Sequence, residues 1–334
     1  MTKTFNLKAV AAAVGICAAV LGAVPAHAYT YATSALQIGG LSLTATNGTA
    51  AVNSFTYNLQ NTATLNGNSV ISTAQCNGGP GFTTCSAASP VLNAPPANAP
   101  GGPARAANDY GFMGFAGPSS YSNSNSVINT AEIVQGVATS TQQIAESLLT
   151  GNGSAAASTT VQSNTTLTFQ LTIAGGTNLN LDFMADPDLQ ARIFNALTGT
   201  YSAQADITSV FTLRNNANST QFVTWAPTGS AGNDCISSIV GTNCLETFDT
   251  QNLNTNVGTG SNNTSVDSSF ETGTVLTRFG INIFNIPNGT YSLTLAANTS
   301  TSIFQRSDVP EPGTMALVGL ALVGLGVAGK RRKA

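Results

Sequence analysis

Apolar and polar residues alternate along several stretches of this chain, and this period of two constrains the fold more than any other feature. The clearest stretches are 167–173, 179–183, 275–286 and 291–297. In the first of them, polar residues separate Leu167, Phe169 and Leu171. Because successive side chains of a β-strand point to opposite faces, this alternation indicates strands with one buried face. The sequence therefore predicts a mainly β protein with antiparallel sheets.

Short glycine-containing segments separate these stretches in pairs. Gly175-Gly176 lies between the first two stretches, and Pro287-Asn288-Gly289-Thr290 lies between the last two. Two alternating stretches joined by such a turn are typical of a β-hairpin. We therefore predict two antiparallel hairpins.

The N-terminal part contains weaker strand signals. Residues 35–45 alternate around Gly39-Gly40, which predicts either a hairpin or a bulged strand. Asn66-Gly67 predicts a turn after a strand expected at 55–59. Closely spaced strands of this kind are typical of a sandwich or a barrel.

Two segments predict helices instead. In 126–149 apolar residues recur at spacings of three, four and seven, and Gly151 follows as a stop. In 186–197 Asp186 is a suitable N-cap and Pro187 suits the first helical position.

Residues 76–118 are rich in proline, glycine and alanine, which predicts a long loop. Tyr110, Phe112 and Phe115 lie within it, separated by glycines. They form either a binding patch for carbohydrate or a partner, or the anchor of the loop on the core. Together these features predict one antiparallel β-sandwich-like domain over residues 29–305, with two helices and a long Pro/Gly-rich loop.

Charge is scarce in this 334-residue chain, of which only 7% is Asp, Glu, Lys or Arg. Between Tyr29 and Val309 there is no lysine, and the basic residues are five arginines. Binding to nucleic acid requires a basic surface that neutralises phosphates, so we expect no nucleic-acid partner. Low charge with moderate apolar content favours a folded β-rich protein over a disordered one.

The C-terminal end combines a short breaker, an apolar segment and a basic cluster. Pro310-Glu311-Pro312 precedes the apolar run 313–329, and Lys330, Arg331, Arg332 and Lys333 follow it. A helix over this run reaches about 25 Å, at the short end of what spans a bilayer. The basic cluster favours a cytoplasmic end, so we expect the preceding chain to lie outside. A buried C-terminal core helix is the alternative.

The N-terminal end fits the same topology. Lys3 and Lys8 are followed by the apolar stretch 9–24 and by the small-residue site Ala26-His27-Ala28. This pattern predicts a secretory signal peptide over residues 1–28, cleaved after Ala28. An N-terminal membrane anchor is the alternative. Cleavage would remove the sole histidine of the chain.

The tripartite C-terminal end, over residues 306–334, resembles the PEP-CTERM sorting signal of Gram-negative bacteria. The resemblance rests on residues 309–334. It implies recognition by an exosortase-type membrane protease, removal of the tail, and release or attachment at the cell surface after transit through the inner membrane and periplasm. Proteins with this signal usually accompany exopolysaccharide and biofilm matrix, so exopolysaccharide is an implied partner. The signal is shared by unrelated ectodomains and implies a route, not an activity.

Four cysteines remain after the predicted cleavage, in two local pairs. Cys76 and Cys85 form one pair, and Cys235 and Cys244 form the other. In an oxidising periplasm an even count in local pairs indicates disulfides, and closing two short loops is the simplest of three connectivities. The spacing within each pair is too wide for a typical four-thiolate metal site.

Enzymatic chemistry can be tested by elimination. The predicted mature chain has no histidine for a Ser-His-Asp triad and its domain has no lysine for a Ser-Lys dyad. A glycosidase built on two carboxylates remains, drawn from Asp182, Asp206, Asp234, Glu246, Asp249 and Glu271. No motif selects a pair among them, so we expect no enzyme and no cofactor.

Three aspartates, Asp182, Asp186 and Asp188, raise a calcium hypothesis because their oxygens fall within seven residues. The EF-hand spacing is missing, and capping of the predicted helix explains Asp186 and Asp188 without an ion. We expect a non-enzymatic exported surface or matrix protein. The alternatives are a carbohydrate-binding or adhesive module and a carboxylate-dependent polysaccharide-active enzyme.

Overall fold

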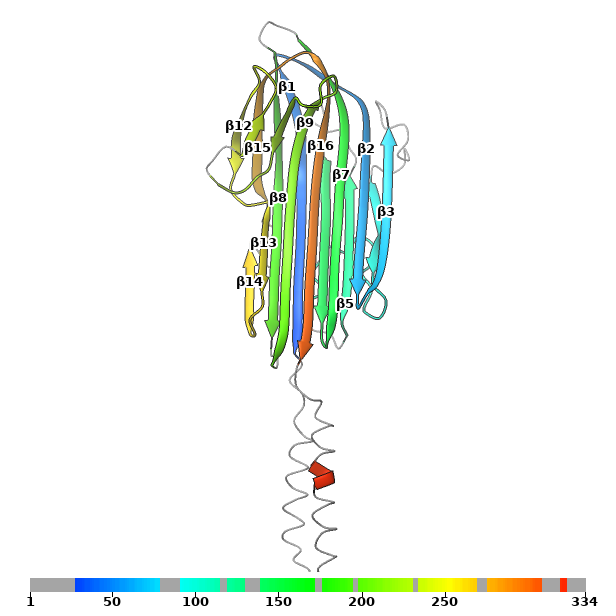
Figure 1. Ribbon diagram of the computed structural model, residues 1–334. Helices are drawn as coiled ribbons and strands as arrows, with labels where there is room; N and C mark the ends of the chain where they lie inside the picture. Colours follow the sequence, from blue (N-terminus) through cyan, green and yellow to red (C-terminus); the bar gives the residue numbers. More distant parts are fainter. Residues whose placement is uncertain are drawn as a thin grey trace, which may run out of the picture.

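The computed structural model describes residues 28–78, 91–114, 119–129, 139–171, 176–194, 198–230, 234–268, 275–307 and 319–322. These residues form two eight-stranded antiparallel sheets stacked as a sandwich (Figure 1). The prediction of a mainly β, sandwich-like fold is therefore confirmed.

The first sheet, sheet A, contains the first strand of the domain near its centre. Its order is β12 (Asn243–Asp249), β15 (Thr277–Ile286), β8 (Thr177–Phe194), β1 (Tyr29–Thr46), β6 (Thr139–Leu149), β5 (Tyr121–Asn129) and β4 (Val91–Asn98), with β14 (Thr264–Ser268) also paired to β8.

The second sheet, sheet B, contains the last strand of the domain near its centre. Its order is β11 (Cys235–Ser237), β10 (Phe222–Trp225), β9 (Gly199–Asn215), β16 (Gly289–Ser307), β7 (Gly153–Leu171), β2 (Gly48–Leu65) and β3 (Asn68–Gly78), with β13 (Thr255–Thr259) also paired to β9. The long strands of both sheets run along the long axis of the molecule (Figure 1).

Strand β1 begins and strand β16 ends at the same end of the sandwich, which we call the tail end. Thr30 Oγ1 donates a hydrogen bond to Gln305 Oε1 at 3.1 Å, so the two termini of the β domain lie side by side. Ser307 N also donates to Asn152 Oδ1 at 2.8 Å. We call the opposite end the distal end.

One part of the space between the sheets is filled by large apolar side chains. We call this part the apolar region and define it by Phe183, Phe211, Trp225 and Phe279, each at most 3% exposed. The rings of Phe183 and Phe279 stack with centroids 5.1 Å apart, and those of Phe211 and Trp225 lie 5.3 Å apart.

Another part of the same space is filled by small polar side chains, and we call it the polar region. It is defined by Asn61, Ser126, Gln143, Ser147, Thr159 and Thr301, all buried. Hydrogen bonds cross between the sheets there: Ser147 Oγ to Thr301 Oγ1 at 2.9 Å, Thr159 Oγ1 to Gln143 Oε1 at 2.8 Å, and Ser126 Oγ to Asn61 Oδ1 at 2.7 Å.

Both helix predictions are wrong. The expected helix over 126–149 covers parts of β5 and β6, which pair with each other. The expected helix over 186–197 covers the second half of β8, through Phe194. Pro187 is tolerated in this strand because the neighbour on one side changes there: β15 ends its pairing opposite Ala185, and β14 begins opposite Leu189.

The two predicted hairpins contain real strands but wrong pairings. β7 lies in sheet B and β8 in sheet A, and likewise β15 lies in sheet A and β16 in sheet B. The chain therefore crosses between the sheets at these turns. The turn at Asn66-Gly67 does join paired strands, since Leu65 is opposite Asn68 and both turn residues have positive φ angles. Residues 35–45 form a bulged strand, with Gly40 at φ 66°.

The expected long loop over 76–118 is interrupted by strand. β3 extends to Gly78, and β4 includes Pro95 and Pro96 at a break in its pairing with β5. Prolines are accepted there because β4 is an edge strand.

The predicted membrane helix lies mostly outside the described residues, of which only 319–322 are helical. In the part of the chain that the structure describes, no helix has both the length and the apolar character needed to cross a bilayer. The predicted signal peptide also lies outside the described residues, except for Ala28.

Candidate functional site

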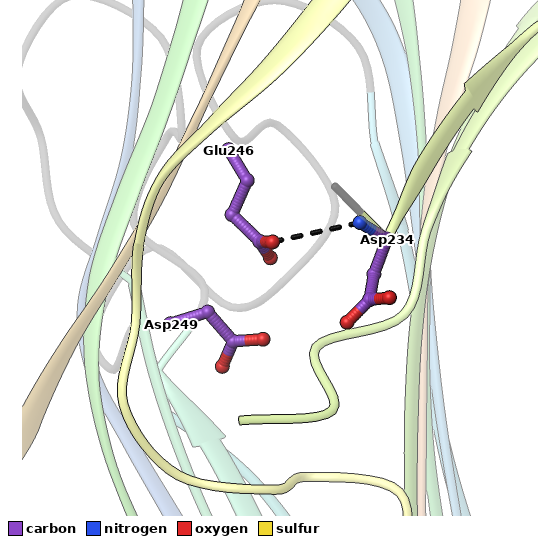
Figure 2. Close-up of side chains that lie close together, drawn as sticks. All are labelled: Asp234, Glu246 and Asp249. Carbon is purple, nitrogen blue, oxygen red and sulfur yellow. Dashed lines mark hydrogen bonds between the residues drawn. The ribbon is translucent and has the colours of Figure 1, made fainter. Parts of the chain in front are cut away.

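Three carboxylates meet where the edges of the two sheets come together. Asp234 directly precedes β11 of sheet B, and Glu246 and Asp249 belong to β12 of sheet A. One oxygen of each lies within 4.8 Å of an oxygen of the others. Figure 2 shows the three side chains converging, with Asp234 N hydrogen-bonded to Glu246 Oε2 at 3.5 Å. We call this group the acidic cluster.

Neighbouring donors hold each carboxylate in place. Trp225 Nε1 donates to Glu246 Oε1 at 2.5 Å. The backbone N–H groups of Thr228 and Gly229 both donate to Asp249 Oδ2 at 2.9 Å. The hydroxyl of Thr228 donates to Asp234 Oδ2. The acidic cluster is thus oriented by the last residue of β10 and the segment that follows it.

Burial decides the electrostatics of the acidic cluster. It raises the pKa of Glu246, the hydrogen bond from Trp225 opposes that shift, and the charge of Asp249 adds to it. Burial also raises the pKa of Asp249, against the hydrogen bonds from Gly229 and Thr228. Carboxylates with raised pKa values can exchange a proton closer to neutral pH, and their oxygens are of the kind that Ca²⁺ prefers.

The structure brings together three of the six carboxylates considered for glycosidase chemistry. Glu271 lies outside the described residues, and Asp182 and Asp206 lie elsewhere, on β8 and β9. Asp234, Glu246 and Asp249 come together because the chain crosses between the sheets, and no local sequence pattern predicts this crossing. The elimination among residue types kept Asp234, Glu246 and Asp249 as candidates but could not group them.

The three aspartates of the calcium hypothesis do not gather. Asp182 forms an ion pair with Arg278, in which Arg278 Nη2 and Asp182 Oδ2 are 2.5 Å apart. Asp186 Oδ2 accepts a hydrogen bond from Val275 N at 3.0 Å. Among the described residues, the acidic cluster is the single group of three or more potential metal ligands, and it includes none of these aspartates.

The segment 99–114 covers the outer face of sheet A and is held by a buried ion pair. Arg105 on this segment pairs with Glu146 of β6, and both side chains have no exposed surface. The carboxylate of Glu146 also accepts hydrogen bonds from Tyr31 Oη at 2.5 Å and from Met113 N at 2.9 Å. Burial and the Glu146 charge raise the pKa of Tyr31.

This ion pair bears on the aromatic cluster predicted as either a patch or an anchor. Tyr110 and Phe112 are only partly exposed, and burial raises the pKa of Tyr110. Arg105 Nη1 donates to the carbonyls on either side, Asp109 at 3.0 Å and Gly111 at 2.8 Å. The described part of the cluster therefore fits the anchor interpretation, while Phe115 lies outside the described residues.

One disulfide joins the two sheets beside the acidic cluster. Cys235 of β11 and Cys244 of β12 are bonded, with their Cα atoms 6.1 Å apart. It therefore links the edge strands of sheet B and sheet A. Cys76 is also disulfide-bonded, and Cys85 lies outside the described residues.

The sorting residues Pro310, Glu311 and Pro312 and the basic residues 330–333 lie outside the described residues. Residues 308–333 match the family model of the PEP-CTERM protein-sorting motif. The chain ends in a PEP-CTERM sorting motif. The predicted resemblance is confirmed, and it identifies an exported protein sorted by an exosortase to the cell surface or the extracellular space. Comparisons with curated proteins and with solved structures find no match.

Proposed function

We propose that this exported protein is a non-enzymatic surface or matrix protein that acts by contact. The observation that carries the proposal is the position of the two termini of the β domain. Strand β16 ends beside the start of β1, so the chain continues into the sorting tail from the tail end of the sandwich. Strand β1 has 18 residues, so the sandwich reaches about 60 Å from its point of attachment.

The part of sheet B that is formed by β3, β2 and β7 contains no charged residue and is rich in hydrogen-bonding groups. On the outer face of sheet B, the neighbouring exposed side chains of Thr73, Gln60 and Thr160 belong to β3, β2 and β7. Such a face suits contact with uncharged polar partners. Association with exopolysaccharide, which the sorting motif implies, is part of this proposal.

A carbohydrate-binding module is the second candidate, and the same neutral face favours it. Hydroxyl and amide side chains can exchange hydrogen bonds with sugar hydroxyls. The aromatic cluster is a weaker surface for this purpose because Tyr110 and Phe112 are only partly exposed. Binding of the exported protein to a glycan array, lost in a Gln60→Ala/Thr160→Ala variant, would support this candidate.

The proposal is tested by measuring export and enzymatic activity separately. The full chain is expressed in an exosortase-containing host that lacks its own copy, and the exported form is identified by its intact mass. A Glu246→Gln/Asp249→Asn variant removes two of the three ionisable groups of the acidic cluster and keeps a hydrogen-bond acceptor at both positions. We expect it to be exported normally and to restore surface or matrix material as well as the wild type does.

Release of reducing ends from the host polysaccharide by the wild type, abolished in the folded double variant, would overturn the non-enzymatic proposal. An Asp206→Asn variant is the matched control, because it neutralises a carboxylate that lies elsewhere, on β9 of sheet B. A Glu311→Ala variant serves as the control for the route, since it should retain the sorting tail.

A further inference from the structure

Strand β3 is an edge strand of sheet B whose own residues include no charge, proline or bulge that would discourage pairing. It pairs with β2 over eleven consecutive residues without a register shift, and among the described residues no strand pairs with its other edge. Its sequence, NSVISTAQCNG, contains no charge and no proline. An edge of this kind presents unpaired N–H and C=O groups to another chain.

The other edges of the described sandwich each carry a feature that discourages pairing. β4 contains Pro95 and Pro96 at a break in its register. β12 contains a register shift after Glu246 and carries the charge of Asp249. β11 has three residues, and β13 and β14 have five each. Protection at all these edges makes its absence at β3 informative.

We propose that β3 pairs in antiparallel orientation with β3 of a second copy of this chain. A twofold axis makes an edge complementary to itself, since each copy offers the same donors and acceptors in reverse order. Strand β3 carries no charge that would oppose its own copy. It also carries β-branched Val70, Ile71 and Thr73, and Ile71 is 61% exposed although it is apolar.

The register of sheet B fixes how the two copies would lie. Thr73 at the centre of β3 is opposite Gln60 of β2, and Gln60 is opposite Thr160 of β7. Thr160 is opposite Asn298, the middle residue of β16. A twofold axis at Thr73 therefore places the two sandwiches side by side over their full length.

Antiparallel pairing also places the two tail ends at opposite poles of the dimer. Two copies attached to the same membrane face could not adopt this arrangement. The pairing is open to copies released from the tail, or to copies on two surfaces that face each other. The interaction thus joins exported molecules that are not attached side by side to the same surface.

A disulfide trap tests the pairing in the exported full-length product. In a Thr73→Cys variant the two introduced thiols meet at the twofold axis, with Cα atoms about 4.5–5.5 Å apart, within reach of a disulfide. The matched control is Gln60→Cys, on the same exposed face but one strand further from the axis, which is too far.

We expect the first variant to run as a covalent dimer on a non-reducing gel and the second as a monomer. Equal cross-linking of both variants, or cross-linking of Thr73→Cys to a different protein, would overturn the proposal.

Sedimentation of the purified exported protein gives a second test that needs no new thiol. The wild type should sediment as a dimer at micromolar concentration. Thr73→Lys places two like charges opposite each other and should weaken dimerisation about tenfold, whereas Gln60→Lys should not. A wild type that stays monomeric at tens of micromolar would contradict the pairing.

Discussion

The apolar region and the polar region fill the same space between the same two sheets by different means. In the apolar region Phe183, Phe211 and Trp225 are stabilised by the burial of large surfaces. In the polar region Ser147, Thr301 and other small side chains are buried because they hydrogen-bond across the sheets. The first arrangement depends on volume, and the second depends on hydrogen bonds between buried side chains of the two sheets. The two regions should therefore respond to different substitutions.

The largest effect is expected from a cavity in the apolar region. Phe183→Ala removes a ring that contacts Phe279 and Trp225 and is 1% exposed. It should lower the free energy of unfolding by about 3–5 kcal/mol, measured by urea denaturation. Val240→Ala, at a side chain that is 84% exposed, is the control and should change it by less than about 0.5 kcal/mol. Similar losses in both variants would contradict the assignment of the apolar region as core.

The next largest effect is expected at the Arg105–Glu146 ion pair, which holds segment 99–114 on the outer face of sheet A. Arg105→Met leaves Glu146 buried without its charged partner and should cost about 3 kcal/mol or more. Faster proteolysis within segment 99–114 should accompany this loss.

Arg278→Met is the matched control for this ion pair. It removes an arginine that is exposed, in a pair with Asp182, and should change stability little. If both arginine variants lost the same free energy of unfolding, burial would not explain the contribution of the Arg105–Glu146 pair to stability.

A smaller effect is expected inside the polar region. A double-mutant cycle there separates the loss of a hydrogen-bond partner from the change in side-chain volume. Ser147→Ala alone leaves Thr301 without a partner, and Thr301→Val alone leaves Ser147 without one. Each should cost about 1–2 kcal/mol in urea denaturation. The double variant should cost less than the sum of the two, because both polar groups are removed together. Strictly additive losses would mean that this hydrogen bond does not couple the two side chains.

The smallest effect is expected from the acidic cluster, whose Glu246 accepts a hydrogen bond from Trp225 of the apolar region. The raised pKa values of Glu246 and Asp249 mean that the folded state holds these protons to higher pH than the unfolded chain. Their favourable contribution is complete below the ordinary values of 4.5 and 3.8 and is lost as pH rises through the raised values. The free energy of unfolding of Glu246→Gln/Asp249→Asn should therefore depend less on pH than that of the wild type. Parallel pH profiles would contradict the shifts.

The sequence predicts strands well where one face is apolar, and it misleads where both faces are buried. In β15 alternation placed Phe279 and Ile281 on the face that the structure buries. In β6, Gln143 faces sheet B and Glu146 faces segment 99–114, so both faces are covered and the remaining apolar spacing imitates a helix. The sequence could not predict which strands pair, because similar turn residues occur both in hairpins and where the chain crosses between the sheets.

The same limit applies to the candidate site. Asp234, Glu246 and Asp249 were on the list of candidates, but only the edge where β11 meets β12 brings them together. Glu146, within the segment 126–149 that was predicted as a helix, was not among the candidates, although it accepts hydrogen bonds from Tyr31 and Met113 in the interior. Residue type suggested the chemistry, and the topology decided which residues share it.

The position of β16 determines how this protein would bear a mechanical load. Any pull transmitted through the sorting tail acts on the end of β16, which pairs over 17 residues with β9 and over 17 with β7. The hydrogen bonds of antiparallel strands lie across the strand direction, so such a pull shears both ladders at once and does not peel them bond by bond. The tail therefore continues from a strand that is hydrogen-bonded on both edges along almost its whole length.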